Sequence, residues 1–287
     1  MESMKKIGVC ILATALTVST LCACGTKDKP GKTKDEPNPS VSAGNADGAG
    51  KVNENYFEWR DNTIIGVTDE GSKETSVIIP ARCEGFSGVI FQDTDITEIT
   101  FEDDDDVALD VAFMGASQLA SVRLPANLTV IPSMCFEGCE GLISMTIPAS
   151  VTTLEEYAFK YCSALESLVF QGNQLSVIGG HSFENCSALK TLDIPDGVTT
   201  IGQYAFADCG ALETITLSES VNKIEKFAFS NIAAKSISLP EGIRVETMDT
   251  SAFGMNTYEM VVYVVEGSWS DQNREIWDVG FNEIRYQ

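Results

Sequence analysis

Apolar residues return along most of this chain with a nearly constant period. In the middle copies a small residue precedes a phenylalanine, a cysteine follows three positions later, and a leucine comes three positions after that, as in Ala158–Leu165. An apolar period of 20 to 50 residues is typical of a solenoid of stacked coils. We therefore expect one elongated repeat domain. Successive phenylalanines are 23 or 24 residues apart, at Phe113, Phe136, Phe159, Phe183, Phe206, Phe229 and Phe253.

Each repeat also contains a short segment in which apolar residues alternate with polar ones. Alternation predicts a strand whose apolar side chains point inward. In four copies proline follows the strand directly, where a backbone donor is no longer needed. A second apolar pair such as Val151 and Leu154 precedes the next phenylalanine. Each coil should thus contain a strand, a turn, a second extended piece and a short helical turn. The inward pairs are Val122/Leu124, Met145/Ile147, Leu168/Phe170, Leu192/Ile194, Ile215/Leu217 and Ile237/Leu239.

The residues between these inward pairs must point outward, and they form two columns that we take as the candidate ligand face. One column is Ser121, Ser144, Ser167, Thr191, Thr214 and Ser236, and its neighbour is Arg123, Thr146, Val169, Asp193, Thr216 and Ser238. Hydroxyl residues also favour strands for structural reasons, so composition alone does not indicate binding. Neither column contains an aromatic residue, which disfavours a tight site for stacked sugars.

The beginning of the chain predicts export. In residues 1–23, Lys5 and Lys6 precede an uncharged stretch that ends in small residues. Leu21–Cys24 resembles a bacterial lipobox, in which Cys24 would receive the lipid and become the mature N-terminus. An ordinary cleaved signal and an uncleaved membrane anchor are the alternatives. Residues 24–53 have no apolar period and are rich in Lys, Asp, Pro, Ser and Gly, which predicts a flexible tether.

The rest of the chain divides into three parts. Residues 54–101 should form an N-terminal cap and degenerate repeats, residues 102–257 the repeats proper, and residues 258–287 a C-terminal cap. β-Branched and aromatic clusters predict the strands before the repeats. The cap at the end should contain a strand, a helix within 268–278 and a last strand. The early strands are expected around 56–59, 63–67, 76–80 and 96–101.

Charge excludes one class of partner. The formal net charge is −23, which repels nucleic acid and anionic lipid surfaces. The acidic run Glu102–Asp106 lacks the spaced ligands and turn glycine of a calcium-binding loop. We therefore expect a solvated acidic loop and no metal site.

The cysteines of the repeats follow the repeat register. Adjacent coils would bring neighbouring cysteines close enough for disulfides, so geometry leaves pairing open. Ala116 and Ile232 take the same position in the outer repeats, which favours a column of buried free thiols. A zinc site at Cys135 and Cys139 is disfavoured, because the two belong to different repeat positions and no second pair is near. The column is Cys139, Cys162, Cys186 and Cys209.

No catalytic set emerges from the sequence. The only histidine, His181, stands two residues before Phe183, where Tyr157, Tyr204 and Phe227 stand in other coils. It is therefore predicted to pack as an aromatic ring, not to act in acid–base chemistry. No nucleophile elbow, phosphate-binding loop or dinucleotide motif is present, so we expect no cofactor and no enzyme activity.

Across 101–253 the pattern AF-x-x-C-x-x-L-x-x-(I/L)-x-(I/L)-P resembles the BspA-type leucine-rich repeat of bacterial surface proteins. The resemblance implies an α/β repeat solenoid, mainly β, with a right-handed superhelix, short helical turns and caps. It also implies a surface location and a role in adhesion or protein binding. Our leading hypothesis is a lipid-anchored module that binds a protein on a host or neighbouring cell. Binding of polysaccharide or cell wall is the alternative.

Overall fold

The computed structural model describes residues 52–243, 251–254, 260–272 and 283–286. The predicted signal, Cys24 and nearly all of the predicted tether lie outside these residues. Contacts divide the chain into residues 1–46 and a compact unit of residues 47–287, to which all of the following refers. Among the described residues, no helix is long and apolar enough to cross a membrane.

The compact unit begins with a small mixed sheet. After the short 3₁₀ helix η1 (Glu54–Tyr56), β1 (Phe57–Arg60) pairs antiparallel with β2 (Thr63–Val67). β2 in turn pairs parallel with β4 (Gly85–Phe86). The strands expected near residues 56–59 and 63–67 are thus confirmed. A second 3₁₀ helix, η2 (Gly71–Lys73), leads into the repeats.

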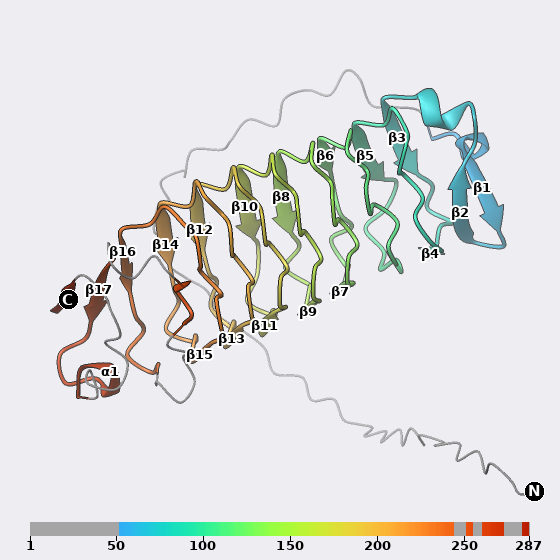
Figure 1. Cartoon of the computed structure of the whole chain (residues 1–287). Coiled ribbons are helices and arrows are strands. Elements are labelled where there is room, and N and C mark those ends of the chain that lie inside the picture. The colour runs from blue at the N-terminus through green and yellow to red at the C-terminus, as the bar shows by residue number, and fades with distance from the viewer. Residues whose placement is uncertain (1–51, 244–250, 255–259, 273–282, 287) are drawn as a thin grey trace, which may run out of the picture. The chain divides into compact units, whose positions relative to one another are not determined.

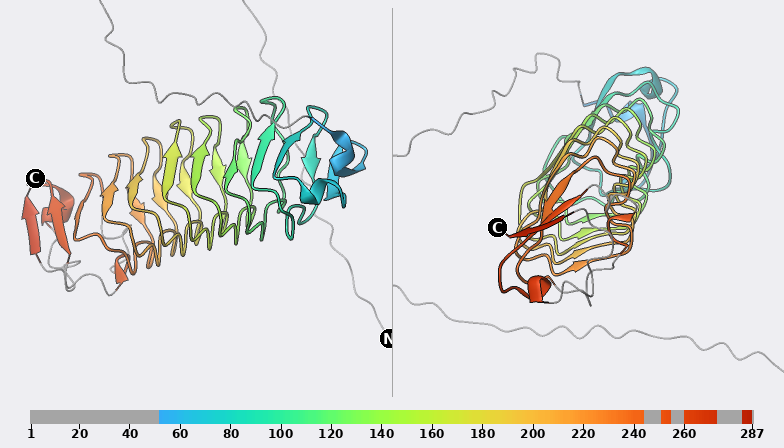
Figure 2. Two further views of the ribbon diagram at one scale, coloured as in Figure 1. Left: turned by 90° about the horizontal axis from the view of Figure 1, so that it is seen from above. Right: turned by 60° about the vertical axis from the view of Figure 1, so that its left-hand side comes forward.

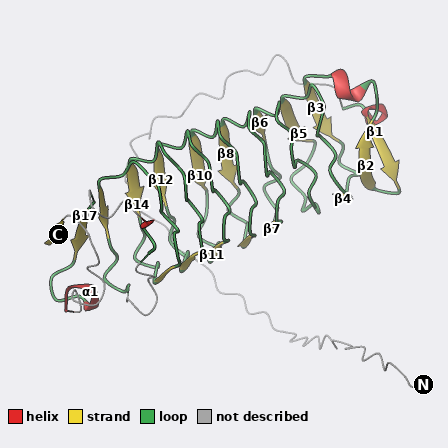
Figure 3. Ribbon diagram, viewed as in Figure 1, coloured by secondary structure: helices red, strands yellow, loops and turns green. Residues whose placement is uncertain are grey.

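Two rows of parallel strands form the solenoid (Figures 1 and 3). We call the first the strand row, and it contains the strands predicted from alternation. The second row is a five-stranded parallel sheet on another side of the coils, which Figure 2 shows from above and at an angle. The strand row consists of β3 (Ser76–Ile79), β5 (Glu98–Phe101), β6 (Ser121–Val122), β8 (Ser144–Ile147), β10 (Ser167–Phe170), β12 (Thr191–Asp193), β14 (Thr214–Thr216), β16 (Ser236–Ser238), β17 (Val261–Val264) and β18 (Glu283–Tyr286). The second row consists of β7 (Val130–Ile131), β9 (Thr153–Leu154), β11 (Val177–Ile178), β13 (Thr200–Ile201) and β15 (Lys223–Ile224).

A ladder of phenylalanines occupies the core, as the period predicted. Each ring from Phe113 to Phe253 is at most 1% exposed and lies nearly parallel to its neighbours, with centroids 4.7 to 5.8 Å apart. The ladder begins one coil earlier than predicted, because Phe91 stacks on Phe113 at 5.1 Å. Of the twelve inward strand residues, ten are buried, and Phe170 and Leu217 pack against the core while partly exposed.

The segments that carry the phenylalanines are turns, so the predicted short helical turns are not confirmed. In the coil of Phe159, both Tyr157 and Tyr161 have φ of 62°, which is incompatible with a continuous right-handed helix. The helical segments of the described residues are η1, η2 and α1 (Trp269–Gln272). The remainder of the helix predicted within 268–278 lies outside the described residues.

Candidate functional site

The candidate ligand face has the geometry that the sequence predicted. All twelve of its residues point outward from the strand row; eleven are exposed, and Ser121 is partly exposed. Ser144 lies opposite Ser167 across β8 and β10, and Thr191 lies opposite Thr214 across β12 and β14. In the first column, hydroxyl residues therefore stand side by side on neighbouring strands, whereas the second column pairs unlike residues such as Thr146 with Val169.

The face continues beyond the repeats, which the sequence reasoning missed. Across β16 and β17, Ser238 pairs with Tyr263, and across β17 and β18, Tyr263 pairs with Arg285. The second column therefore ends in an aromatic and a cationic side chain, the residue types that anchor many interfaces. The alternation of Val262 and Val264 with outward neighbours was the available signal, but we assigned this run to a cap.

A hollow of about 380 Å³ lies where the second column meets the turns after the strands. Arg123 and Thr146 of the ligand face line it together with Gln171 and Asp104. The guanidinium of Arg123 donates to Asp104 at 2.8 Å, and both side chains are about half exposed. The ligand face is thus not flat at this end, and one of its charges is already paired.

The acidic run is a solvated loop, as expected, and two of its carboxylates also contact the next coil. Asp104 accepts hydrogen bonds from Arg123 and from the Ala126 amide, and Asp106 accepts from the amide and hydroxyl of Thr129. These carboxylates therefore hold the turn of the next coil. Among the described residues there is no cluster of ligands that could hold a metal ion.

The aromatics at the start of the compact unit do not form an open sugar platform. Trp59 is partly exposed, but the guanidinium of Arg82 stacks 3.6 Å from its ring centroid. Arg82 is in turn paired with Glu54 at 3.0 Å. The face of Trp59 on which a sugar would stack is therefore occupied. The side chains of Trp269 and Trp277 lie outside the described residues.

The described cysteines are free thiols, as the packing interpretation predicted. Each of the four in the column donates from Sγ to the carbonyl oxygen of the preceding coil's phenylalanine, at 3.1 to 3.4 Å. Burial raises the pKa of Cys139 and of Cys209 to about 12. Burial and these hydrogen bonds give the column thiols a structural role. Cys83, which follows no register, is half-buried, and desolvation raises its pKa as well.

We predict that, of the six described cysteines, Cys83 is alkylated first in the native protein. The column thiols combine burial with a raised pKa, so their rates should be at least about a hundredfold lower, since the thiolate is the reactive species. Mass-spectrometric mapping after brief treatment with iodoacetamide checks this, and urea should make all six reactive. Modification of Cys162 or Cys186 at the rate of Cys83 would contradict the buried column.

His181 packs as an aromatic ring, as predicted. It lies between Tyr157 and Tyr204, with ring centroids 4.8 and 4.9 Å away. Its Nδ1 is 2.7 Å from a carboxylate oxygen of Glu184, which also pairs with Lys160 at 2.8 Å. Burial alone would raise the pKa of Glu184, but hydrogen bonds from Lys160 and His181 outweigh it and lower that pKa. This group belongs to the stacking of the coils and offers no nucleophile.

Comparison with known proteins identifies the repeat. The family model described as the BspA type leucine rich repeat region matches six copies, over residues 70–166 and 153–265. The chain belongs to the BspA-type leucine-rich repeat family. The match begins at residue 70, within the segment predicted to hold degenerate repeats. No curated protein matches the chain.

Solved structures share the fold. A leucine-rich repeat protein from Bacteroides ovatus is 19% identical, with a TM-score of 0.55 and coverage of 78% of this chain. This chain covers 64% of that protein's length. A leucine rich repeat protein from T. pallidum is 22% identical, with a TM-score of 0.48. The alignment covers 82% of this chain and 98% of the T. pallidum protein. The first similarity establishes the mainly-β leucine-rich-repeat fold of this BspA-type chain.

Proposed function

We propose that this BspA-type protein is anchored by a lipid on Cys24 at the outer side of a bacterial membrane and binds other proteins in an adhesin-like role. The observation that carries the proposal is the continuous outward face of the strand row, which runs over many coils above a filled core. Such a surface is preformed, so binding costs little ordering entropy. The mechanism is rigid display without a chemical step.

The strand face is the proposed contact surface because it combines exposure with regular spacing. Its hydroxyl columns offer donors and acceptors on adjacent strands, about 4.8 Å apart. Tyr263 and Arg285 add larger contacts at one end. The partner would be a protein on a host or neighbouring cell. The negative charge of the chain opposes nucleic acid as a partner.

Arginine at both Thr191 and Thr214 should weaken capture of such a partner about tenfold or more. These residues face each other across β12 and β14, so two large cations there would prevent close contact at the centre of the face. Quantitative mass spectrometry of surface proteins captured by the immobilised chain measures the effect. The matched control is Glu140→Arg, which changes an exposed residue outside the strand row. Equal capture by the double variant and the control would reject the strand face.

Replacing Cys24 by alanine should abolish lipid attachment. If the lipobox assignment is correct, no other residue can receive the lipid, so incorporation of a palmitate analogue falls to background. Metabolic labelling followed by fractionation of the cells measures both the label and the location. Persistent labelling of the Cys24→Ala protein would reject the proposed anchor.

A further inference from the structure

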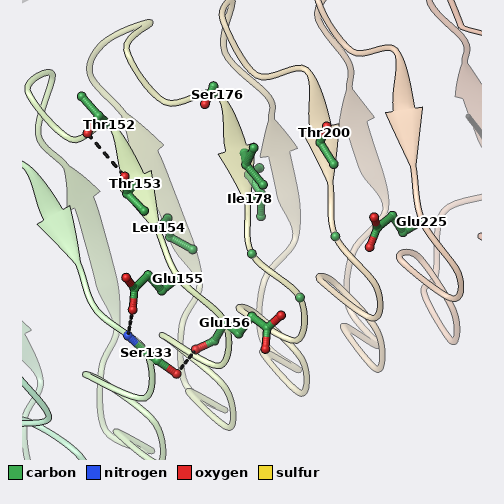
Figure 4. A pocket seen from close by; sticks show the side chains of 14 residues that line it. Ser133, Thr152, Thr153, Leu154, Glu155, Glu156, Ser176, Ile178, Thr200 and Glu225 are labelled. Carbon is green, nitrogen blue, oxygen red and sulfur yellow. Dashed lines mark hydrogen bonds between the residues drawn. The ribbon is translucent and has the colours of Figure 1, made fainter. Parts of the chain in front are cut away.

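A second hollow lies on the other side of the coils, away from the candidate ligand face. It has a volume of about 590 Å³ and crosses β9, β11 and β13 of the second row. Thr153, Val177 and Thr200 line it from the strands. Figure 4 shows Glu155 and Glu156 toward one end and Glu225 toward the other. The repeat pattern by itself gives these residues no role, since all are outside the strand row.

A hydrogen bond that recurs between neighbouring coils is absent at two of the coils that line this hollow. In two coils the glutamate after the second strand accepts from a backbone amide of the preceding coil: Glu155 from Ser133 at 2.9 Å, and Glu225 from Gln203 at 3.1 Å. At the two intervening coils, the residue in the place of that glutamate is Gly179 or Gly202. The carboxylates that would accept from the amides of Glu156 and Gly180 are therefore missing.

These two amides are unmatched donors among the residues that line the hollow. Among the described residues, neither the Glu156 nor the Gly180 amide has a hydrogen-bond acceptor. The equivalent amides of Ser133 and Gln203 donate to carboxylates on the hollow's rim, and from the repeat register we infer that the amides of Glu156 and Gly180, which also line the hollow, face it too. Glu156 is exposed and Gly180 partly exposed, so water can bind these amides, and an acceptor on a ligand would take the place of that water.

The charge of the rim decides what kind of acceptor fits. Glu155 and Glu225 already accept from backbone amides, and Lys223 pairs with Glu225. The exposed carboxylate of Glu156 has no ion pair among the described residues. Three carboxylates and a net charge of −23 repel an anionic ligand, whereas a neutral carbonyl beside a cation satisfies both the amides and Glu156.

We propose that this hollow binds an extended basic segment of a partner protein. A backbone carbonyl of that segment accepts from the Gly180 amide, and a lysine or arginine side chain pairs with Glu156. Thr153 and Thr200 contact the segment from the second row. The inference rests on the proposed protein-binding role, but it concerns a separate surface, so loss of binding at the strand face leaves it intact.

The test uses the full chain in detergent and two probe peptides, acetyl-Thr-Lys-Thr-Lys-Thr-amide and its counterpart with glutamate in place of lysine. Fluorescence anisotropy measures affinity, and hydrogen–deuterium exchange of the segment that contains Gly180 reports on its amide. We expect the lysine peptide to bind and to slow that exchange, and the glutamate peptide to do neither. Binding of both peptides alike, or unchanged exchange at saturation, would overturn the proposal.

Three variants localise the site. Glu156→Gln should lower the affinity for the lysine peptide about three- to tenfold, which is the effect of losing one partly exposed ion pair. Gly180→Gln should weaken binding of the lysine peptide at least about tenfold, because the new side chain fills the hollow. The fold should accept this side chain, because the neighbouring coils carry Glu156 and Gln203 at the same position. Glu140→Gln, an equal charge change elsewhere, should leave affinity within about twofold. A loss in Glu140→Gln as large as in Glu156→Gln would overturn the site, as would binding of cellopentaose in place of the lysine peptide.

Discussion

Replacing Phe183 by alanine is expected to lower the free energy of unfolding by about 3–5 kcal/mol, the usual cost of truncating a buried large aromatic. Its ring is fully buried and stacks between Phe159 at 5.1 Å and Phe206 at 5.2 Å. Alanine would leave a cavity in the middle of the ladder, where both neighbouring coils lose contacts. Urea unfolding followed by circular dichroism measures the change.

The matched control for this substitution is Ile143→Ala. Ile143 is also large and apolar, but it is 53% exposed, so its loss should change the free energy of unfolding by no more than about 0.5 kcal/mol. A cost below about 1 kcal/mol for Phe183→Ala would mean that the phenylalanine ladder does not hold the coils together.

Alanine at Gly197 should cost about 3–5 kcal/mol, for two reasons. Its φ of +99° is unfavourable for any residue with a Cβ, and a Cβ there would overlap the carbonyl oxygen of Asn173 in the preceding coil. The backbone of that coil would have to move to make room. Thermal and urea unfolding of the variant measure the cost.

Gly88 separates the two contributions. It has a similar φ of +92°, but a Cβ there would meet nothing within 4 Å. Gly88→Ala should therefore show only the backbone strain, about 1–2 kcal/mol. Equal costs for Gly88→Ala and Gly197→Ala would show that the close approach to Asn173 contributes nothing.

The sequence predicted most of the fold because each coil repeats the same local pattern. Alternation placed Met145 and Ile147 inward and Ser144 and Thr146 outward, and the structure agrees. The period placed the phenylalanines in one column, since equivalent positions of stacked coils must lie above one another. The same register correctly assigned His181 to a stack of aromatic rings.

Other features depended on which residues of neighbouring coils meet, and one sequence pattern does not reveal that. The hydrogen bonds of Asp104 and Asp106 to the next coil required the actual path of the turn. The extension of the ligand face to Tyr263 required the pairing of β16 with β17, in which partners such as Ser236 and Val261 are 25 residues apart and not 23 or 24.

By itself the sequence determined the repeat family and the inward and outward faces, because both follow from a local period. It favoured a column of buried thiols, and the structure decided that these cysteines are free. Only the tertiary structure showed that a departure from the repeat pattern opens a hollow on the surface of the second row. The repeat pattern in the sequence does not single out Gly179 or Gly202. Stacked between the coils of Glu155 and Glu225, they leave two amides without their usual carboxylates and open a hollow on the second row.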